Sequence, residues 1–159
     1  MFTLGTVLGF AAVVLATSRT SAPSGALTVG SSGSYSTIQN AVDALDTDTS
    51  EAQSIFIEAG TYSEQVYIQA LSGPLTIYGY TEDTASYADN KVIITADKAL
   101  SEESTDDETA TLRVWTTDFK MYNVDVKNTY GSATSNGQAL ALSASAEACA
   151  IDVSCVDLC

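Results

Sequence analysis

The 159-residue sequence contains no histidine. Nucleophilic hydrolases of the Ser-His-Asp and Cys-His types need an imidazole as general base, so both mechanisms are excluded. A zinc knuckle completed by histidine is excluded for the same reason. Any hydrolytic chemistry in this chain must therefore depend on carboxylates.

Basic residues are also scarce: six Lys and Arg stand against 20 Asp and Glu, which gives a net charge of -14. This charge disfavours nucleic acid and anionic membrane surfaces as partners. Part of the excess lies in "DKALSEESTDDE", Asp97 to Glu108, a run typical of a solvated loop. A calcium site is the alternative there, but the run has neither the spacing nor the turn glycine of an EF-hand, so we predict no metal site.

Cysteine is absent until the last eleven residues, which contain Cys149, Cys155 and Cys159. An odd number in a secreted chain leaves at least one thiol without an internal partner. This cysteine-containing end looks unlike the rest of the chain.

Long apolar runs are missing except for "LGTVLGFAAVVLA", Leu4 to Ala16. A membrane span needs about 20 apolar residues, so this run is too short to be one. Small residues follow it at Ala16 to Ser18, which predicts a signal peptide over residues 1–18 and a secreted, extracellular protein. A buried N-terminal helix is the alternative, because no Lys or Arg precedes the run.

One amphipathic helix is predicted in "SYSTIQNAVDALD". Ile38, Ala41, Val42 and Leu45 follow the helical spacing, and Ser36 or Thr37 precedes them as the cap.

The remainder is predicted to be all-β, because it consists of short apolar runs rich in β-branched and aromatic residues. These runs are Ser54 to Ile57, Gln65 to Ile68, Leu75 to Gly79, Lys91 to Thr95, Thr111 to Trp115, Phe119 to Asn128 and Gln138 to Ala144. In the run from Phe119, alternation places Tyr122, Val124 and Val126 on one face and Asn123 on the other.

The spacing of these strands distinguishes between two all-β folds, the parallel β-helix and the β-sandwich. The interval between strand centres varies from 9 residues (Ile68 to Ile77) to 21 residues (Ile93 to Val114). Variable loops are typical of a parallel β-helix, whereas a β-sandwich predicts turn signals every 8 to 12 residues. We therefore predict one domain with a parallel β-helix and a capping helix at its N-terminal end.

Five segments in the same order resemble the pectin methylesterases, closest to secreted fungal members. They are "YSTIQNAVDAL", "FIEAGTYSEQV", "LTIYGY", "TATLRVWTTDFKMYNVDVKNTYG" and "GQALALSA". The resemblance covers residues 27–144, and it implies a right-handed, pectin-lyase-like parallel β-helix. It also implies hydrolysis of the methyl esters of pectin galacturonate, with release of methanol and without a metal.

The resemblance implies roles for individual residues. Gln138 matches a glutamine that stabilises the oxyanion, and Gly60, Tyr62 and Glu64 match the family signature in "FIEAGTYSEQV". Gly60 is predicted to permit a backbone turn that a Cβ would oppose, between apolar runs that form neighbouring turns of the helix. Glu64 is predicted to be structural, accepting hydrogen bonds from backbone N–H groups at this turn.

The family's reacting groups are two aspartates and an arginine, and their motifs, Gln-Asp-Thr and Gly-x-x-Asp-Phe among them, are absent here. The resemblance ends at Ala144, so the segment 145–159 is predicted to be an unrelated, cysteine-containing tail, and its Asp152 and Asp157 lack the flanking residues of those motifs. We therefore predict no catalytic residue in this chain, which is expected to be a truncated, inactive form of a pectinesterase.

Two other functions fit the residues. One is a non-catalytic carbohydrate-binding or inert β-helix fragment, in which Tyr62, Tyr67, Trp115 and Tyr122 would stack on sugar rings. A calcium-dependent polysaccharide lyase of the same architecture would cleave unesterified polymer.

Overall fold

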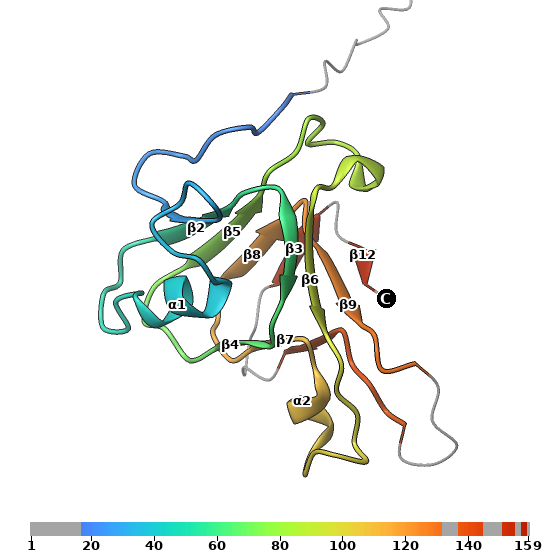
Figure 1. Ribbon diagram of the computed structural model, residues 1–159. Helices are drawn as coiled ribbons and strands as arrows, with labels where there is room; N and C mark the ends of the chain where they lie inside the picture. The colour runs from blue at the N-terminus through green and yellow to red at the C-terminus, as the bar shows by residue number, and fades with distance from the viewer. Residues whose placement is uncertain (1–16, 132–136, 145–150, 155–156, 159) are drawn as a thin grey trace, which may run out of the picture.

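Short parallel strands make up most of the regular secondary structure in the computed structural model, which describes residues 17–131, 137–144, 151–154 and 157–158 (Figure 1). The strands are β1 (Leu27–Val29), β2 (Gln53–Ile57), β3 (Gly60–Ser63), β4 (Val66–Ile68), β5 (Leu75–Gly79), β6 (Val92–Ala96), β7 (Leu112–Val114), β8 (Phe119–Tyr122), β9 (Asp125–Asn128), β10 (Leu142–Ala144), β11 (Ile151–Ser154) and β12 (Asp157–Leu158). The helical segments are α1 (Ile38–Asp43), the 3-10 helix η1 (Tyr87–Asp89) and α2 (Asp106–Thr109). None of the helices described here is long and apolar enough to cross a membrane.

The strands form three sheets, which the chain visits in a repeating order. The first sheet has the order β1-β2-β5-β8-β11, the second contains β3, β6, β9 and β12, and the third contains β4, β7 and β10. Every strand pair is parallel. Each passage through the sheets, such as β2 to β3 to β4, is one turn, and the next turn stacks on it. The fold is therefore a parallel β-helix, as predicted.

The core consists of apolar ladders that run from turn to turn. Ile55, Ile77 and Met121 occupy successive register positions in the first sheet, and all three are buried. In the third sheet, Val66 pairs with Leu112, and both are buried as well. Side chains of a strand alternate between its faces, so every second residue of these short strands reaches the interior.

Helix α1 packs against β1, β2 and β4, the strands at the start of the stack (Figure 1). It begins at Ile38, because the Thr37 side chain accepts a hydrogen bond from the Asn40 N–H as the N-cap. Ile38, Ala41 and Val42 are buried, which agrees with the predicted apolar face. The helix ends at Asp43, so Leu45 lies just beyond it, although its side chain is also buried.

The prediction of a single strand from Phe119 to Asn128 is wrong. The segment forms two strands in different sheets, β8 and β9, separated by Asn123 with a φ of 58°. This left-handed conformation turns the chain and breaks the alternation, so Asn123 is buried with an exposed fraction of 1%. Asparagine tolerates this conformation better than most residues.

The predicted strand from Gln138 to Ala144 is shorter in the structure, where β10 begins at Leu142. The backbone before it bonds to neighbouring loops. The Leu140 carbonyl accepts from the Thr111 N–H at 3.0 Å, and its N–H donates to the Thr109 hydroxyl at 3.2 Å. These bonds hold the segment beside the preceding turn without a regular ladder.

Candidate functional site

The third sheet carries a row of polar and aromatic side chains on its outer face. Tyr67, Arg113 and Ser143 share one register position in β4, β7 and β10. Leu112 and Val114, the neighbours of Arg113, are buried in the core, so Arg113 points away from it. The row therefore places one side chain from each of three successive turns at the surface.

Asp107, on the short helix α2, accepts hydrogen bonds from two members of this row, Arg113 and Ser143. Its Oδ2 accepts a hydrogen bond from Arg113 Nε at 2.8 Å and also pairs with Nη2, and its Oδ1 accepts one from Ser143 Oγ at 2.8 Å. The Trp115 Nε1–H donates to the same Oδ1 at 3.3 Å. Partial burial acts to raise the pKa of Asp107, but the hydrogen bonds from Ser143, Arg113 and Trp115 outweigh it and hold the pKa below its ordinary value.

Two aromatic rings complete this surface. The rings of Tyr67 and Trp115 meet edge to face, with centroids 5.8 Å apart and planes at 84°. The guanidinium carbon of Arg113 lies 4.7 Å from the centre of the Tyr67 ring, in a cation–π contact. Trp115 keeps an exposed fraction of 43%. We call Tyr67, Asp107, Arg113 and Trp115 the Trp115 platform.

The acidic run that contains Asp107 is not simply the solvated loop that its composition predicts. Thr105 and Glu108 form a capping box that starts helix α2, and Glu103 pairs with Lys98. The sequence signal for this helix is Thr-x-x-Glu at positions 105 to 108, the pattern of a capping box. Asp107 was missed because nothing local shows that its partners, Arg113 and Ser143, lie beside it.

The predicted oxyanion residue, Gln138, is exposed and lies on the segment that leads into β10. Its carbonyl accepts a hydrogen bond from the Leu100 N–H at 3.0 Å. Asn128, at the end of β9, supports the same segment through its side-chain amide, which donates to the carbonyls of Thr109 at 2.9 Å and Leu140 at 3.1 Å. The backbone is therefore held by hydrogen bonds at Gln138 itself and at Leu140, two residues further on.

The signature residues lie elsewhere, on and after β3. Gly60 pairs with Val92 inside that strand, and a Cβ added to it would make ordinary contact with the Tyr62 ring at 3.5 Å. The predicted need for glycine at a turn is therefore wrong, and the flanking strands, β2 and β4, belong to different sheets of the same turn and not to neighbouring turns. The Tyr62 hydroxyl donates to the Glu58 carbonyl at 2.9 Å. Burial, helped by the charges of Glu58 and Glu64, raises the pKa of Tyr62.

Glu64 connects this signature to helix α1. Its two carboxylate oxygens accept hydrogen bonds from the N–H groups of Ile38, at 2.9 Å, and Gln39, at 3.0 Å. These donors belong to the first turn of α1, where backbone N–H groups have no partner within the helix. The bonds are of the predicted kind, but their donors come from the helix and not from the turn beside Gly60.

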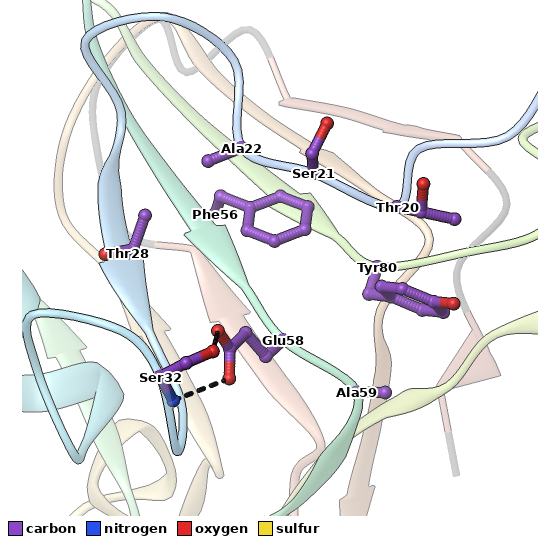
Figure 2. Close-up of a pocket in the computed structure, with 9 residues that line it drawn as sticks. All are labelled: Thr20, Ser21, Ala22, Thr28, Ser32, Phe56, Glu58, Ala59 and Tyr80. Atoms are coloured by element: carbon purple, nitrogen blue, oxygen red, sulfur yellow. Dashed lines mark hydrogen bonds between the residues drawn. The ribbon is translucent and has the colours of Figure 1, made fainter.

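A cavity of about 580 Å³ lies at the start of the stack, between the first sheet and residues 20–22 (Figure 2). Phe56 and Tyr80 form part of its wall, and Figure 2 shows Glu58 pointing to Ser32. Glu58 accepts from the Ser32 N–H at 3.1 Å and from its hydroxyl, and these bonds hold the pKa of Glu58 below its ordinary value. The carboxylate therefore fastens the loop after β1 to the end of β2.

Several predicted residues cannot be placed. The three cysteines lie outside the described residues, and of Asp152 and Asp157 only the strands β11 and β12 that contain them are described. Across the described part of the chain, no group of three or more Asp, Glu, Cys or His side chains could hold a metal ion.

Comparison with known proteins gives one consistent result. The family model described as Pectinesterase matches residues 26–157. A pectinesterase of Aspergillus niger is 55% identical over 136 residues, and one of Aspergillus aculeatus is 53% identical over 142 residues. These matches cover 85% and 87% of this chain but only 40% and 42% of the relatives. The chain thus spans about 40% of the length of the curated relatives that it matches.

Solved structures agree with the sequence comparison. The crystal structure of the pectin methylesterase from Aspergillus niger, in deglycosylated form, matches with a TM-score of 0.80 and 43% identity, over 87% of this chain and 44% of that one. The pectin methylesterase from carrot matches with a TM-score of 0.68 and 27% identity, over 84% of this chain and 40% of that one.

Proposed function

This chain belongs to the pectinesterase family, and from that membership we propose that the full-length protein acts on pectin as a carboxylic ester hydrolase. The reaction is hydrolysis of the methyl esters of galacturonate units, with release of methanol, in the degradation and modification of plant cell walls. The match of the family model to residues 26–157 carries this proposal. The substrate would be methyl-esterified homogalacturonan.

Within this chain, Gln138 is the residue proposed to contact the reacting ester. Its side-chain amide would donate a hydrogen bond to the oxyanion that forms when the carbonyl is attacked. One such donor typically contributes about 3 kcal/mol to transition-state stabilisation, provided that it is held in place beforehand. The bonds of Leu100 and Asn128 to the segment around Gln138 support this role, because they fix its backbone.

The chain of 159 residues contains neither the Gln-Asp-Thr motif nor the Gly-x-x-Asp-Phe motif. Family members take from these motifs the aspartate that attacks the carbonyl and the aspartate that serves as acid and then as base. A donor to the oxyanion cannot split an ester without a nucleophile. We therefore propose that residues 1–159 alone have no esterase activity.

A methanol-release assay on the purified 159-residue chain, with highly esterified pectin as substrate, tests this proposal. We expect release at the background rate, and Gln138→Ala should leave that rate unchanged. An activity that disappears on replacing Asp152 or Asp157 by alanine would contradict the proposal, because the tail would then supply the missing carboxylates.

A second candidate function is pectin binding without catalysis. The exposed Trp115 beside Tyr67 favours it, since aromatic rings are common contact surfaces for ligands with apolar faces. Retention of the chain on esterified pectin without release of methanol would support this function.

We also propose that the protein is secreted and that cleavage falls near Ala16 to Ser18. The composition of residues 1–18 supports this. N-terminal sequencing of protein collected from the medium of an expressing fungal host is the direct test, and a mature protein that begins at Met1 would overturn it.

A further inference from the structure

Trp115 is held in one orientation although it is exposed. Among the described residues, the exposed large hydrophobic side chains are Tyr87, at 65%, and Trp115, at 43%. The Trp115 backbone N–H donates to the Ile68 carbonyl at 2.8 Å, its indole N–H donates to Asp107, and its ring meets Tyr67 at 84°. An aromatic ring that is already oriented loses little conformational freedom when a ligand stacks on it.

The charges beside the ring cancel each other. Arg113 uses both Nε and Nη2 on the same oxygen of Asp107, so its positive charge is already paired. Asp107 in turn accepts hydrogen bonds from Arg113, Trp115 and Ser143. Neither group is therefore available to pair with a charge on a ligand. The net charge of -14 on the whole chain opposes the approach of an anion.

From these contacts we propose that the Trp115 platform is a subsite that stacks a methyl-esterified galacturonate ring and discriminates against the free galacturonate. The C–H face of the pyranose would lie on the indole of Trp115, with Tyr67 and Asp107 holding that ring in place. This inference rests on the proposed function, because it takes pectin as the ligand. The platform adds a binding site that prefers the esterified unit. It lies in the turns that contain β4 and β7, which hold no residue proposed to contact the reacting ester.

Trp115 is the single tryptophan of the sequence, so its fluorescence reports on the platform directly. The purified chain should be titrated with fully methyl-esterified oligogalacturonides and with de-esterified oligogalacturonides of the same length. We expect a saturable change in tryptophan emission with the esterified oligomer, and binding several-fold weaker for the de-esterified oligomer. Emission that does not respond to the esterified oligomer, or equal affinity for both, would overturn the inference.

Substitutions test the stacking contact by calorimetry. Trp115→Ala should weaken binding of the esterified oligomer about tenfold, as expected for the loss of one aromatic stacking partner. Trp115→Phe should retain most of the affinity. Tyr87→Ala removes the other exposed aromatic ring of the described residues, from η1, and should leave binding unchanged as a matched control. Equal losses in Trp115→Ala and Tyr87→Ala would contradict a specific platform.

Asp107→Asn tests whether the pairing of Arg113 with Asp107 causes the discrimination. Asp107→Asn keeps an oxygen that can accept from Trp115 but leaves Arg113 without a charged partner. We expect the affinity for the de-esterified oligomer to rise relative to the esterified one. An unchanged ratio of affinities would overturn the assigned basis of the discrimination.

Failure of the Trp115 platform can be distinguished from failure of the proposed function by comparing the native chain with the Trp115→Ala variant. If the native chain and the Trp115→Ala variant bind esterified pectin equally well, the platform is wrong and pectin recognition stands. If neither protein binds esterified pectin, both the platform and recognition of pectin by this part of the family fold are contradicted.

Discussion

Asn123 and Gly79 are the pair of residues that best show how single positions define this fold. The left-handed backbone of Asn123 directs its carbonyl toward Gly79 at the end of β5. The Asn123 side chain is held at the same time, because its Oδ1 accepts from Arg19 at 3.1 Å and its Nδ2 donates to Asn90 at 3.3 Å. The corner between β8 and β9 thus depends on close backbone contact.

We predict that Gly79→Ala destabilises the protein by about 1–3 kcal/mol, the usual range for overpacking. A Cβ at this position would lie 2.0 Å from the Asn123 carbonyl oxygen, so one strand must move. Urea unfolding gives the free energy. Gly60→Ala is the matched control, because the nearest atom to its Cβ belongs to the Tyr62 ring at an ordinary contact distance of 3.5 Å, and it should change stability by less than about 1 kcal/mol. Equal effects of the two substitutions would contradict this account.

Asp107 provides a prediction of pH dependence. Its pKa in the folded state lies below the ordinary value, so the ionised form is stabilised by folding. That stabilisation is complete above the unfolded-state pKa of about 4 and is lost as the pH falls through the folded-state value. Thermal unfolding of the native chain and of Asp107→Asn should therefore differ most near neutral pH, and the difference should shrink below about pH 4. A difference that is constant between pH 7 and pH 3 would show that Asp107 is not the titrating group.

At the scale of elements, α1 and the signature segment depend on each other. Helix α1 has six residues, which is too short to be stable by itself. Its buried face and the carboxylate of Glu64 at its first turn supply the missing stabilisation. The glutamate of the signature motif thus connects β3 to an element that precedes it in the chain.

We expect Glu64→Ala to cost about 1–3 kcal/mol of stability, because the N–H groups of Ile38 and Gln39 would lose their partner in a partly buried place. Glu82→Ala, at an exposed glutamate, should stay within about 0.5 kcal/mol of the native chain. Urea unfolding and far-ultraviolet circular dichroism together measure the loss. If Glu64→Ala is as stable as Glu82→Ala, the carboxylate does not hold the helix.

The sequence predicted some elements better than others. The run from Leu75 to Gly79 is β5 in the structure, because its alternation of buried and partly exposed residues is a local pattern. The strand β3 was missed, since Gly-Thr-Tyr-Ser has no apolar alternation and pairs with β6 from the next turn. The break at Asn123 was missed because it follows from packing against Gly79, a residue far away in the sequence.

On the scale of the whole molecule, the stack of turns leaves strands at its edges. In the described parts of the chain, β10, β11 and β12 each pair on one side only, with β7, β8 and β9. Unpaired edges of parallel sheets are templates for association with another chain. The net charge of -14 makes two copies of the chain repel each other, and this repulsion opposes such association.

We predict that edge pairing prevails over charge repulsion when salt screens the repulsion. The purified 159-residue chain should remain in solution at low ionic strength and should associate or precipitate as salt is raised to about 0.5 M, where the screening length falls below about 5 Å. Light scattering and size-exclusion chromatography measure the association. A soluble monomer with one sharp thermal transition across this range of salt would contradict the prediction.

The parallel β-helix and the family could be predicted from the sequence, because these follow from short apolar runs separated by variable loops and from motifs that are continuous in the chain. The sequence also identified the helix that follows Thr37 and pointed to Gln138. Two other features became visible only in the folded molecule: Asp107, Arg113, Ser143 and Trp115 meet on one face, and Glu64 holds the start of α1. These contacts join residues from different parts of the chain, because a β-helix brings together residues that are one turn apart. The variable loops between its strands leave the partner of each side chain unspecified until the turns stack in register.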